Sequence, residues 1–221
     1  MKSNTKVNVI ITSCLFLAFI VFTILVKFVD VQPIGPNASE VGFASLNDVV
    51  YKMFKYNQTL YDITEILGIV TFLIIGLFAV LGVYQLIKGK SIKKVDYKIL
   101  VLGCFYVVVL LFYILFEIIV VNCRPVLMDG ELEASYPSSH TMLSICVVTS
   151  AIVVLSEMFE KKKWLRNAIV IVGYALIAFT VAGRMLCGVH WVTDIIGAML
   201  LAFALVMLFY SALDYIKDKV K

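Results

Sequence analysis

The sequence predicts an all-α integral membrane protein, a bundle of six transmembrane helices with its N- and C-termini in the cytoplasm. Apolar residues make up 62% of the chain and its mean hydropathy is +1.00, which excludes a soluble globular domain. Six apolar runs of about 17–25 residues are each long enough to cross a hydrocarbon core of roughly 30 Å. Cationic residues gather in the segments that would lie on one side of the membrane, which predicts the orientation.

Each apolar run is expected to form one helix. A backbone in lipid must satisfy its own hydrogen bonds, and uninterrupted apolar runs do not alternate as the strands of a membrane barrel do. In chain order the predicted spans lie near Val7–Phe28, Ile66–Ile87, Ile99–Val121, Met142–Met158, Leu165–Ala182 and Val189–Leu213.

The longest segment expected outside the membrane covers residues 30–61. Its first part, Gln32-Pro33-Ile34-Gly35-Pro36, predicts a turn. The mixed apolar and polar residues after Ser39 predict a short amphipathic helix lying on the membrane surface. We expect residues 1–221 to form a single transmembrane domain.

The distribution of Lys and Arg predicts which end of the bundle faces the cytoplasm. With the N-terminus inside, 14 of the 19 cationic residues fall in inner segments. These are Lys2, Lys6, Lys88, Lys90, Lys93, Lys94, Lys98, Lys161, Lys162, Lys163, Arg166, Lys217, Lys219 and Lys221. Because short cytoplasmic loops are enriched in Lys and Arg, both termini are predicted to be cytoplasmic.

Polar residues gather where four of the predicted spans meet the outer face. The third run ends at Arg124, the fourth is preceded by Pro137-Ser138-Ser139-His140, the fifth ends at Arg184, and the sixth begins at His190-Trp191-Val192-Thr193-Asp194. The two histidines are the only ones in the chain. Ionisable groups at membrane depth are expensive and usually functional. The topology therefore predicts one site at the outer end of the bundle.

The residue types in this cluster suit phosphate chemistry. The arginine guanidinium matches phosphate oxygens, and a helix that Pro137 opens would offer the free amides of its first turn to an anion. We expect Arg124, Ser138, Ser139 and Arg184 to bind phosphate. Asp194 lies four residues after His190, so on a helix it would orient that imidazole as a nucleophile, and His140 would protonate the leaving oxygen.

The spacing of these residues resembles that of the type 2 phosphatidic acid phosphatase family of membrane lipid phosphatases. The family pattern is a Lys, six residues and Arg-Pro; then Pro-Ser-Gly-His; then Ser-Arg, five residues, His, three residues and Asp. Arg124-Pro125, Pro137, Ser138, His140, Arg184, His190 and Asp194 match it. The resemblance covers all six helices and implies His190 as the phosphorylated nucleophile, Asp194 as its partner, His140 as the acid, and Arg124, Ser138 and Arg184 as phosphate ligands.

Three positions depart from the family pattern. Ser139 replaces a Gly, Gly183 replaces a Ser, and Glu117 stands where the family has Lys. Seven residues are nearly two helical turns, so Glu117 is expected on the same helix face as Arg124, about 10 Å deeper. An unpaired carboxylate there would be costly, so Glu117 should either bond a cation such as Arg124 or Arg184 or be protonated. We favour the pairing, in which Glu117 holds an arginine behind the phosphate site.

The resemblance implies metal-independent hydrolysis of a lipid phosphate or diphosphate through a phosphohistidine, at the extracytoplasmic face of the cell membrane. Phosphatidylglycerol phosphate, phosphatidic acid and undecaprenyl diphosphate are the substrates considered. A lipid phosphotransferase and a non-catalytic lipid-phosphate binding or transport protein are open alternatives, the latter because of Glu117.

No cofactor and no metal are implied. The expected partners are the bilayer and the lipid phosphate, and not nucleic acid, because no aromatic-basic surface is present. Oligomeric state and pairing of Cys123 with Cys187 stay open.

Overall fold

The protein is described by a computed structural model that covers residues 3–220. Within this range the chain is all-helical, with six helices long and apolar enough to cross a membrane, as the sequence predicts. The helices are α1 (Ser3–Phe28), α2 (Ala44–Phe54), α3 (Gln58–Gly89), α4 (Tyr97–Ile118), α5 (Ser139–Leu143), α6 (Thr149–Met158), α7 (Lys163–Leu186) and α8 (Val192–Val220), with short turns η1 (Pro36–Ala38) and η2 (Ile92–Lys94).

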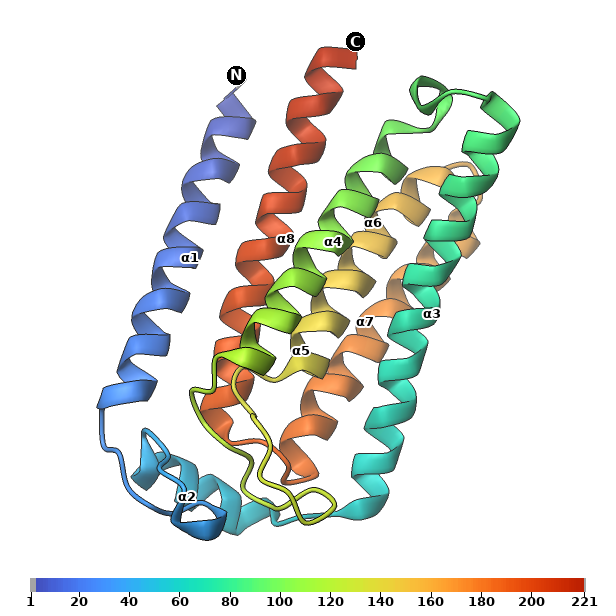
Figure 1. The fold of residues 1–221 in the computed structure, drawn as a ribbon. Coiled ribbons are helices and arrows are strands. Elements are labelled where there is room, and N and C mark those ends of the chain that lie inside the picture. Colours follow the sequence, from blue (N-terminus) through green and yellow to red (C-terminus); the bar gives the residue numbers. More distant parts are fainter. Residues whose placement is uncertain (1–2, 221) are drawn as a thin grey trace.

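Helix α8 runs through the middle of the bundle, with α1 alongside it and α4 on its other side (Figure 1). Its buried face consists of Ala198, Leu201, Ala202, Leu205 and Phe209, each at most 1% exposed. These residues are three or four apart, so they form one stripe along the helix. The small residues in the stripe allow neighbouring helices to pack closely, which is how membrane helices associate without a hydrophobic driving force between them.

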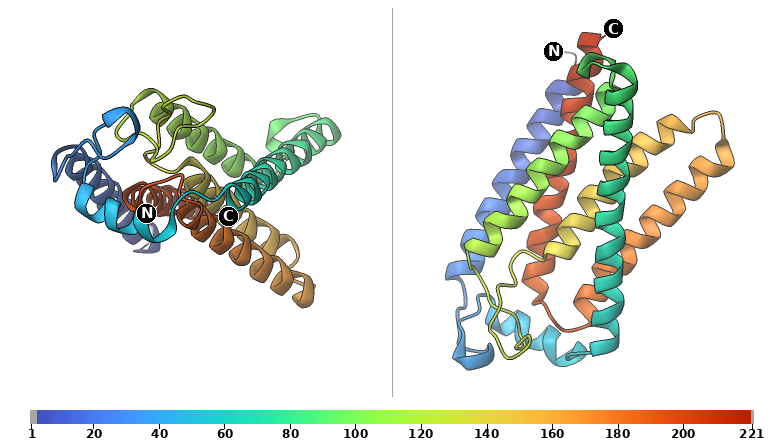
Figure 2. Two further views of the ribbon diagram at one scale, coloured as in Figure 1. Left: turned by 90° about the horizontal axis from the view of Figure 1, so that it is seen from below. Right: turned by 45° about the vertical axis from the view of Figure 1, so that its right-hand side comes forward.

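The fourth span is built from α5, the π-helical turn η3 (Ser144–Val148) and α6, which follow one another without a break. Helices α6 and α7 diverge from α3 toward the end that carries the termini (Figure 2). At the other end α3, α5, α7 and α8 converge. The divergence places the closest packing of these four helices at the end where the polar cluster was predicted.

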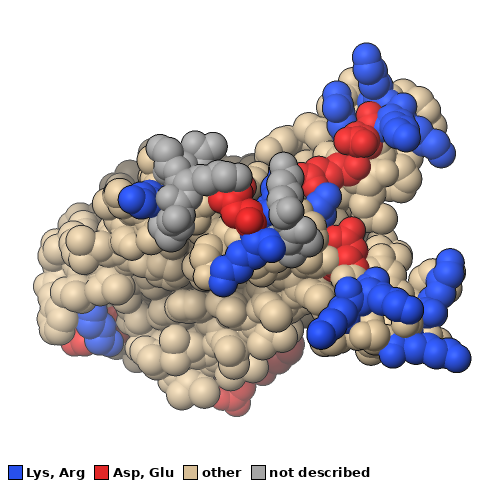
Figure 3. Space-filling model, turned by 90° about the horizontal axis from the view of Figure 1, so that it is seen from above, with Lys and Arg blue, Asp and Glu red and all other residues tan. Residues whose placement is uncertain are grey.

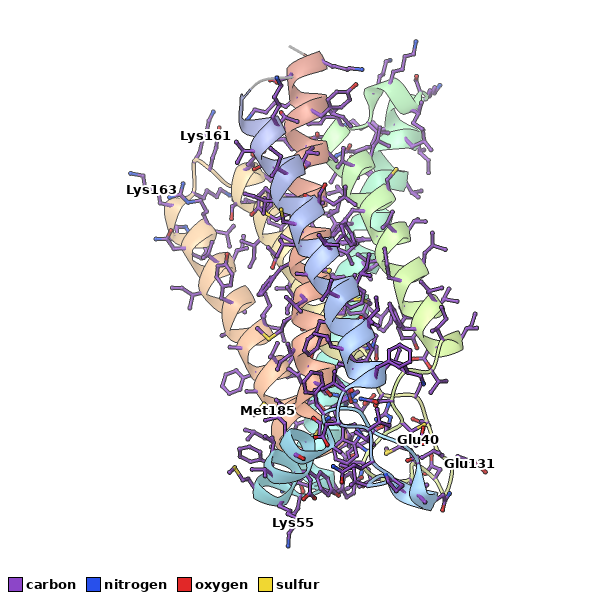
Figure 4. The ribbon with its side chains drawn as sticks, turned by 90° about the vertical axis from the view of Figure 1, so that its left-hand side faces the viewer. Glu40, Lys55, Glu131, Lys161, Lys163 and Met185 are labelled. Carbon is purple, nitrogen blue, oxygen red and sulfur yellow. The ribbon has the colours of Figure 1, made fainter. Side chains whose placement is uncertain are left out.

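The two ends of the bundle differ in the residues that they carry. The N-terminal and C-terminal ends and the loops that follow α3 and α6 lie at one end, where Lys and Arg side chains gather (Figure 3). Lys161 and Lys163 lie there, whereas Lys55, Glu131 and Met185 lie at the opposite end (Figure 4). The fold therefore places the basic segments at one end, although which end faces the cytoplasm stays a prediction.

Helix α2 forms within the segment where the sequence predicts a short amphipathic helix. Ala44 and Asn47 on one face are buried against the bundle, whereas Leu46, Val49 and Met53 on another are exposed. Exposed apolar residues three or four apart are what a helix lying at a membrane interface presents. Helix α3 begins at Gln58, inside the segment 30–61 that is predicted to lie outside the membrane, and the Asn57 side chain accepts a hydrogen bond from the Leu60 amide there.

Candidate functional site

All the predicted site residues lie at the end of the bundle opposite the termini. Arg124 and Ser138 come from the loop between α4 and α5, and Ser139 and His140 from the first turn of α5. Arg184 lies in the last turn of α7, His190 in the short loop after it, and Asp194 in the first turn of α8. Arg184, His190 and Asp194 are all buried in the protein, as is Ser138.

His190 and Asp194 lie side by side, although His190 precedes the helix instead of belonging to it. Nδ1 of His190 is 3.6 Å from Oδ2 of Asp194. The same Oδ2 accepts a hydrogen bond from the Trp191 amide at 2.9 Å, so Asp194 also caps the first turn of α8. The Asn122 side-chain amide lies 3.4 Å from Oδ1. The carboxylate is therefore held from two sides, with one oxygen facing the His190 ring.

The contact between Arg184 and His190 determines which ring nitrogen carries the proton. Nη2 of Arg184 is 3.2 Å from Nε2 of His190. A guanidinium can only donate, so Nε2 must accept and the ring proton lies on Nδ1, facing Asp194. Burial lowers the pKa of His190 well below its usual value, and the nearby positive charges of Arg184 and Arg124 lower it further. The ring is thus neutral near pH 7 and its Nε2 lone pair is available for attack.

A carboxylate that the sequence prediction did not include connects Arg184 to His140. Oε1 of Glu65, on α3, accepts a hydrogen bond from Nη1 of Arg184 at 2.9 Å. Its Oε2 lies 3.4 Å from Nε2 of His140. Both predicted histidines and Arg184 therefore belong to one chain of contacts that runs from Asp194 to His140 through Glu65.

Arg124 approaches the cluster from the loop before α5. Its Nε lies 3.0 Å from Oε2 of Glu133 in the same loop, and its Nη1 is buried without a hydrogen-bond partner among the described residues. The same holds for the Ser138 hydroxyl. Buried polar atoms are almost always hydrogen-bonded in native proteins. Arg124 and Ser138 therefore offer unused donors in the region where phosphate binding was predicted.

A small, partly open pocket adjoins the cluster on the side of α4. His190, Arg124 and Ser139 line its polar part, and Phe112 and Phe116 of α4 line its apolar part. A lipid that carries a phosphate has the same division between an anionic group and an apolar chain. The cavity thus places an apolar wall next to the predicted nucleophile.

The structure corrects the prediction for Glu117. Helix α4 ends at Ile118 and not at Val121, so Arg124 lies in a loop and the expected shared helix face does not exist. Glu117 is exposed and lines the cavity beside Arg124. Among the described residues the carboxylates that bond the two arginines are Glu133 and Glu65. Arg124 lies opposite Glu133 because the two pair through the backbone as well, the Arg124 amide donating to the Glu133 carbonyl at 2.9 Å.

The position of Pro137 also differs from the prediction. Helix α5 begins at Ser139 with Ser138 at the N-cap, so Pro137 precedes the helix by two residues instead of opening it. The Ser138 amide donates to the backbone carbonyl of Asp194 at 3.1 Å, and that bond joins the start of α5 to the start of α8. The two predicted helix starts are thus brought together, although the boundary is shifted.

The glycine at position 183 has a structural explanation. A Cβ placed on Gly183 would lie 2.5 Å from Cγ2 of Thr64 on α3. Even a serine would therefore push α7 away from α3. This close approach brings Arg184, the next residue, within reach of Thr64 and Glu65, to which it hydrogen-bonds at 3.2 and 2.9 Å.

Glu65 was missed because the second span was predicted to begin at Ile66. Glu65 fell between the segment 30–61 and that span and was assigned to neither, whereas α3 begins at Gln58, eight residues before Ile66. The signal was nevertheless in the sequence, since an ionisable residue at the end of a membrane span is a candidate for function by default.

No group of three or more His, Cys, Asp or Glu side chains within the described range is arranged to hold a metal ion. Cys123 and Cys187 are both free thiols.

Comparison with known proteins places this geometry in a family. The sequence model of the PAP2 superfamily matches residues 104–218. The fold is similar to the crystal structure described as the first transmembrane PAP2 type phosphatidylglycerolphosphate phosphatase from Bacillus subtilis, with a TM-score of 0.61 and 22% identity. That match covers 95% of this chain and 97% of the other. None of the curated proteins compared with the chain matches it. Because the family match spans more than half of the chain, the protein belongs to the PAP2 superfamily.

Proposed function

We propose that the protein is a membrane lipid phosphatase that hydrolyses a phosphate ester or diphosphate through a phosphohistidine on His190. The observation that carries the proposal is the arrangement of His190, whose Nδ1 faces Asp194 while its Nε2 accepts from Arg184. A neutral, oriented imidazole beside two arginines is what attack on a phosphate requires. The family match and the phosphatidylglycerolphosphate phosphatase fold support the same reaction class.

In the first step Nε2 of His190 attacks phosphorus and the bond from phosphorus to the lipid oxygen breaks. The leaving oxygen takes a proton from His140 and departs as a lipid alcohol, or as a lipid monophosphate when the substrate is a diphosphate. Arg184, Arg124 and the Ser138 hydroxyl stabilise the charge that develops on the phosphoryl oxygens. The Arg184 contact to Nε2 must open for the attack, and the guanidinium then donates to the phosphate instead.

In the second step water attacks phosphorus and the bond from phosphorus to Nε2 breaks. His140, left neutral by the first step, accepts the proton of the water. Inorganic phosphate leaves, and His190 and His140 return to their starting forms. Asp194 stays beside Nδ1 of His190, where its charge stabilises the positive charge that the phosphorylated ring carries.

We place the reaction at the extracytoplasmic face of the cell membrane. Figure 3 shows the end of the bundle where the Lys- and Arg-rich loops gather. The site lies at the opposite end, and such loops are enriched on the cytoplasmic side. The apolar wall of the cavity next to His190 is suited to a lipid that enters from the bilayer. Phosphatidylglycerol phosphate, phosphatidic acid and undecaprenyl diphosphate are the substrates to test.

The test is phosphate release by the purified protein in detergent, with a chelator present, from a panel of these three lipids. We expect release from at least one of them and a burst of lipid product when the protein concentration is high, because the phosphoenzyme forms before it hydrolyses. Release only when an acceptor other than water is supplied would instead indicate a phosphotransferase. Binding of the lipids without release or phosphohistidine would indicate a binding or transport protein.

A further inference from the structure

One face of α3 contributes to the site although the family match begins only at residue 104. Tyr61, Thr64, Glu65 and Gly68 are spaced three or four residues apart, so they share a face of the helix. This face is directed at Arg184 and His140. Helix α3 thus places side chains next to the predicted site that do not belong to the family motifs.

Three of these residues hold the Arg184 side chain. The Tyr61 ring centroid lies 5.3 Å from Cζ of Arg184, and the Thr64 hydroxyl accepts from Nη1 at 3.2 Å. Oε1 of Glu65 accepts from the same Nη1 at 2.9 Å. The Arg184 side chain is 0% exposed. A buried guanidinium needs an anionic partner, and Glu65 supplies it.

The same face holds His140. Oε2 of Glu65 lies 3.4 Å from Nε2 of His140. A Cβ on Gly68 would lie 2.7 Å from both Cδ2 and Nε2 of that ring, so the absence of a side chain at Gly68 lets the imidazole rest against α3. Because a carboxylate only accepts, Glu65 favours a proton on Nε2 of His140.

We propose that Glu65 is a positioning residue for the acid step. It holds the His140 ring in the orientation that proton transfer to the leaving oxygen requires, as Asp194 does for the nucleophile His190. This inference rests on the proposed phosphatase function. The proton still passes from His140 to the leaving oxygen and returns from water in the second step, so Glu65 is neither consumed nor altered. Each histidine therefore has one carboxylate beside it: Glu65 of α3 lies beside His140, and Asp194 of α8 lies beside His190.

The test uses Glu65→Gln, which keeps the shape of the side chain and removes its charge. We expect kcat/KM for a lipid phosphate, which reports the first step, to fall by about tenfold or more, since loss of an acid costs on the order of 10²–10⁴-fold. For an activated aryl phosphate, whose leaving group needs little protonation, we expect a clearly smaller fall in kcat/KM, because only the effect of Glu65 on Arg184 remains. Asp62→Asn is the matched control, because Asp62 lies on the same helix, is exposed and bonds only Gln58; both of its rates should stay unchanged.

Gly68→Ala tests the inference by a second route, because its methyl group would displace the His140 ring without changing any charge. It should show the same preference for the aryl substrate. Equal losses on the two substrates in both variants would overturn the inference, as would unchanged rates in Glu65→Gln. These outcomes are distinct from failure of the proposed function, in which the unmodified protein would release phosphate from neither substrate.

Discussion

At the scale of single residues, burial gives His190 a lower pKa than that of an ordinary histidine. Burial and the charges of Arg184 and Arg124 lower its pKa. A lowered pKa means that the ring stays neutral, and so nucleophilic, at pH values where a solvent-exposed histidine would already be protonated.

The sign of this shift predicts the acid side of the pH profile. Protonation of His190 abolishes attack, so we expect kcat/KM to fall with decreasing pH only below about 6.5, the ordinary pKa of histidine. The measurement is kcat/KM between roughly pH 4 and pH 8. An aryl phosphate is used as the substrate because its leaving group makes the rate insensitive to His140. A loss of activity centred above the ordinary value would contradict a neutral, buried His190.

Substitution of the two histidines should separate their roles. We expect His190→Ala to abolish turnover of every substrate, because no phosphoenzyme can form. His140→Ala should lower kcat/KM by on the order of 10²–10⁴-fold for a lipid phosphate and far less for an aryl phosphate. Parallel measurements of kcat/KM on the two substrates check this, and equal losses in His140→Ala would remove His140 from the acid role.

At the scale of elements, α2 is tied to the first turn of α8 by a buried pair. The Asn47 side-chain amide donates to the Gly42 carbonyl at 2.7 Å and to the Thr193 hydroxyl at 2.9 Å. Its oxygen lies 3.3 Å from both the amide and the hydroxyl of Thr193. Asn47 is 0% exposed. Because Thr193 precedes Asp194, this pair connects the outer segment to the helix start that carries the carboxylate of the site.

We expect Asn47→Ala to destabilise the protein by about 1–3 kcal/mol, the cost of leaving buried hydrogen-bonding groups unsatisfied. Activity should fall as well, because the first turn of α8 loses a contact that fixes it. Thermal unfolding in detergent and phosphate release are the two measurements. Asp48→Asn is the control, because Asp48 bonds the exposed Lys52 and its loss should change stability by less than about 0.5 kcal/mol. Equal stabilities of the two variants would contradict the role of the pair.

At the scale of the whole molecule, the two ends of the bundle carry different charged residues. Glu131 and Lys161 are exposed and lie at opposite ends (Figure 4). In a background without the five native cysteines, we expect Glu131→Cys to react with a membrane-impermeant thiol reagent added to intact cells. Lys161→Cys should react only after permeabilisation. The reverse pattern would place the site on the cytoplasmic leaflet.

The sequence alone determined the class of fold and most of the residues brought together at the site. Apolar runs of membrane length admit helices and little else, because a backbone in lipid must bond to itself. Short loops then bring the ends of successive helices to alternate sides, so Arg124, His140, Arg184 and His190 are predicted to lie at one end, and the structure brings them there. Their catalytic roles stay predictions.

Only the tertiary structure decided which charged groups pair. Glu65 contacts Arg184 and His140 because α3 and α7 approach closely at Gly183 and Thr64. That distance depends on side-chain packing between helices far apart in the chain. Glu117, placed beside an arginine by helical spacing, pairs with neither one because α4 ends before Arg124. Periodicity constrains residues within one helix, whereas ion pairs between helices depend on where each helix ends and how closely it packs.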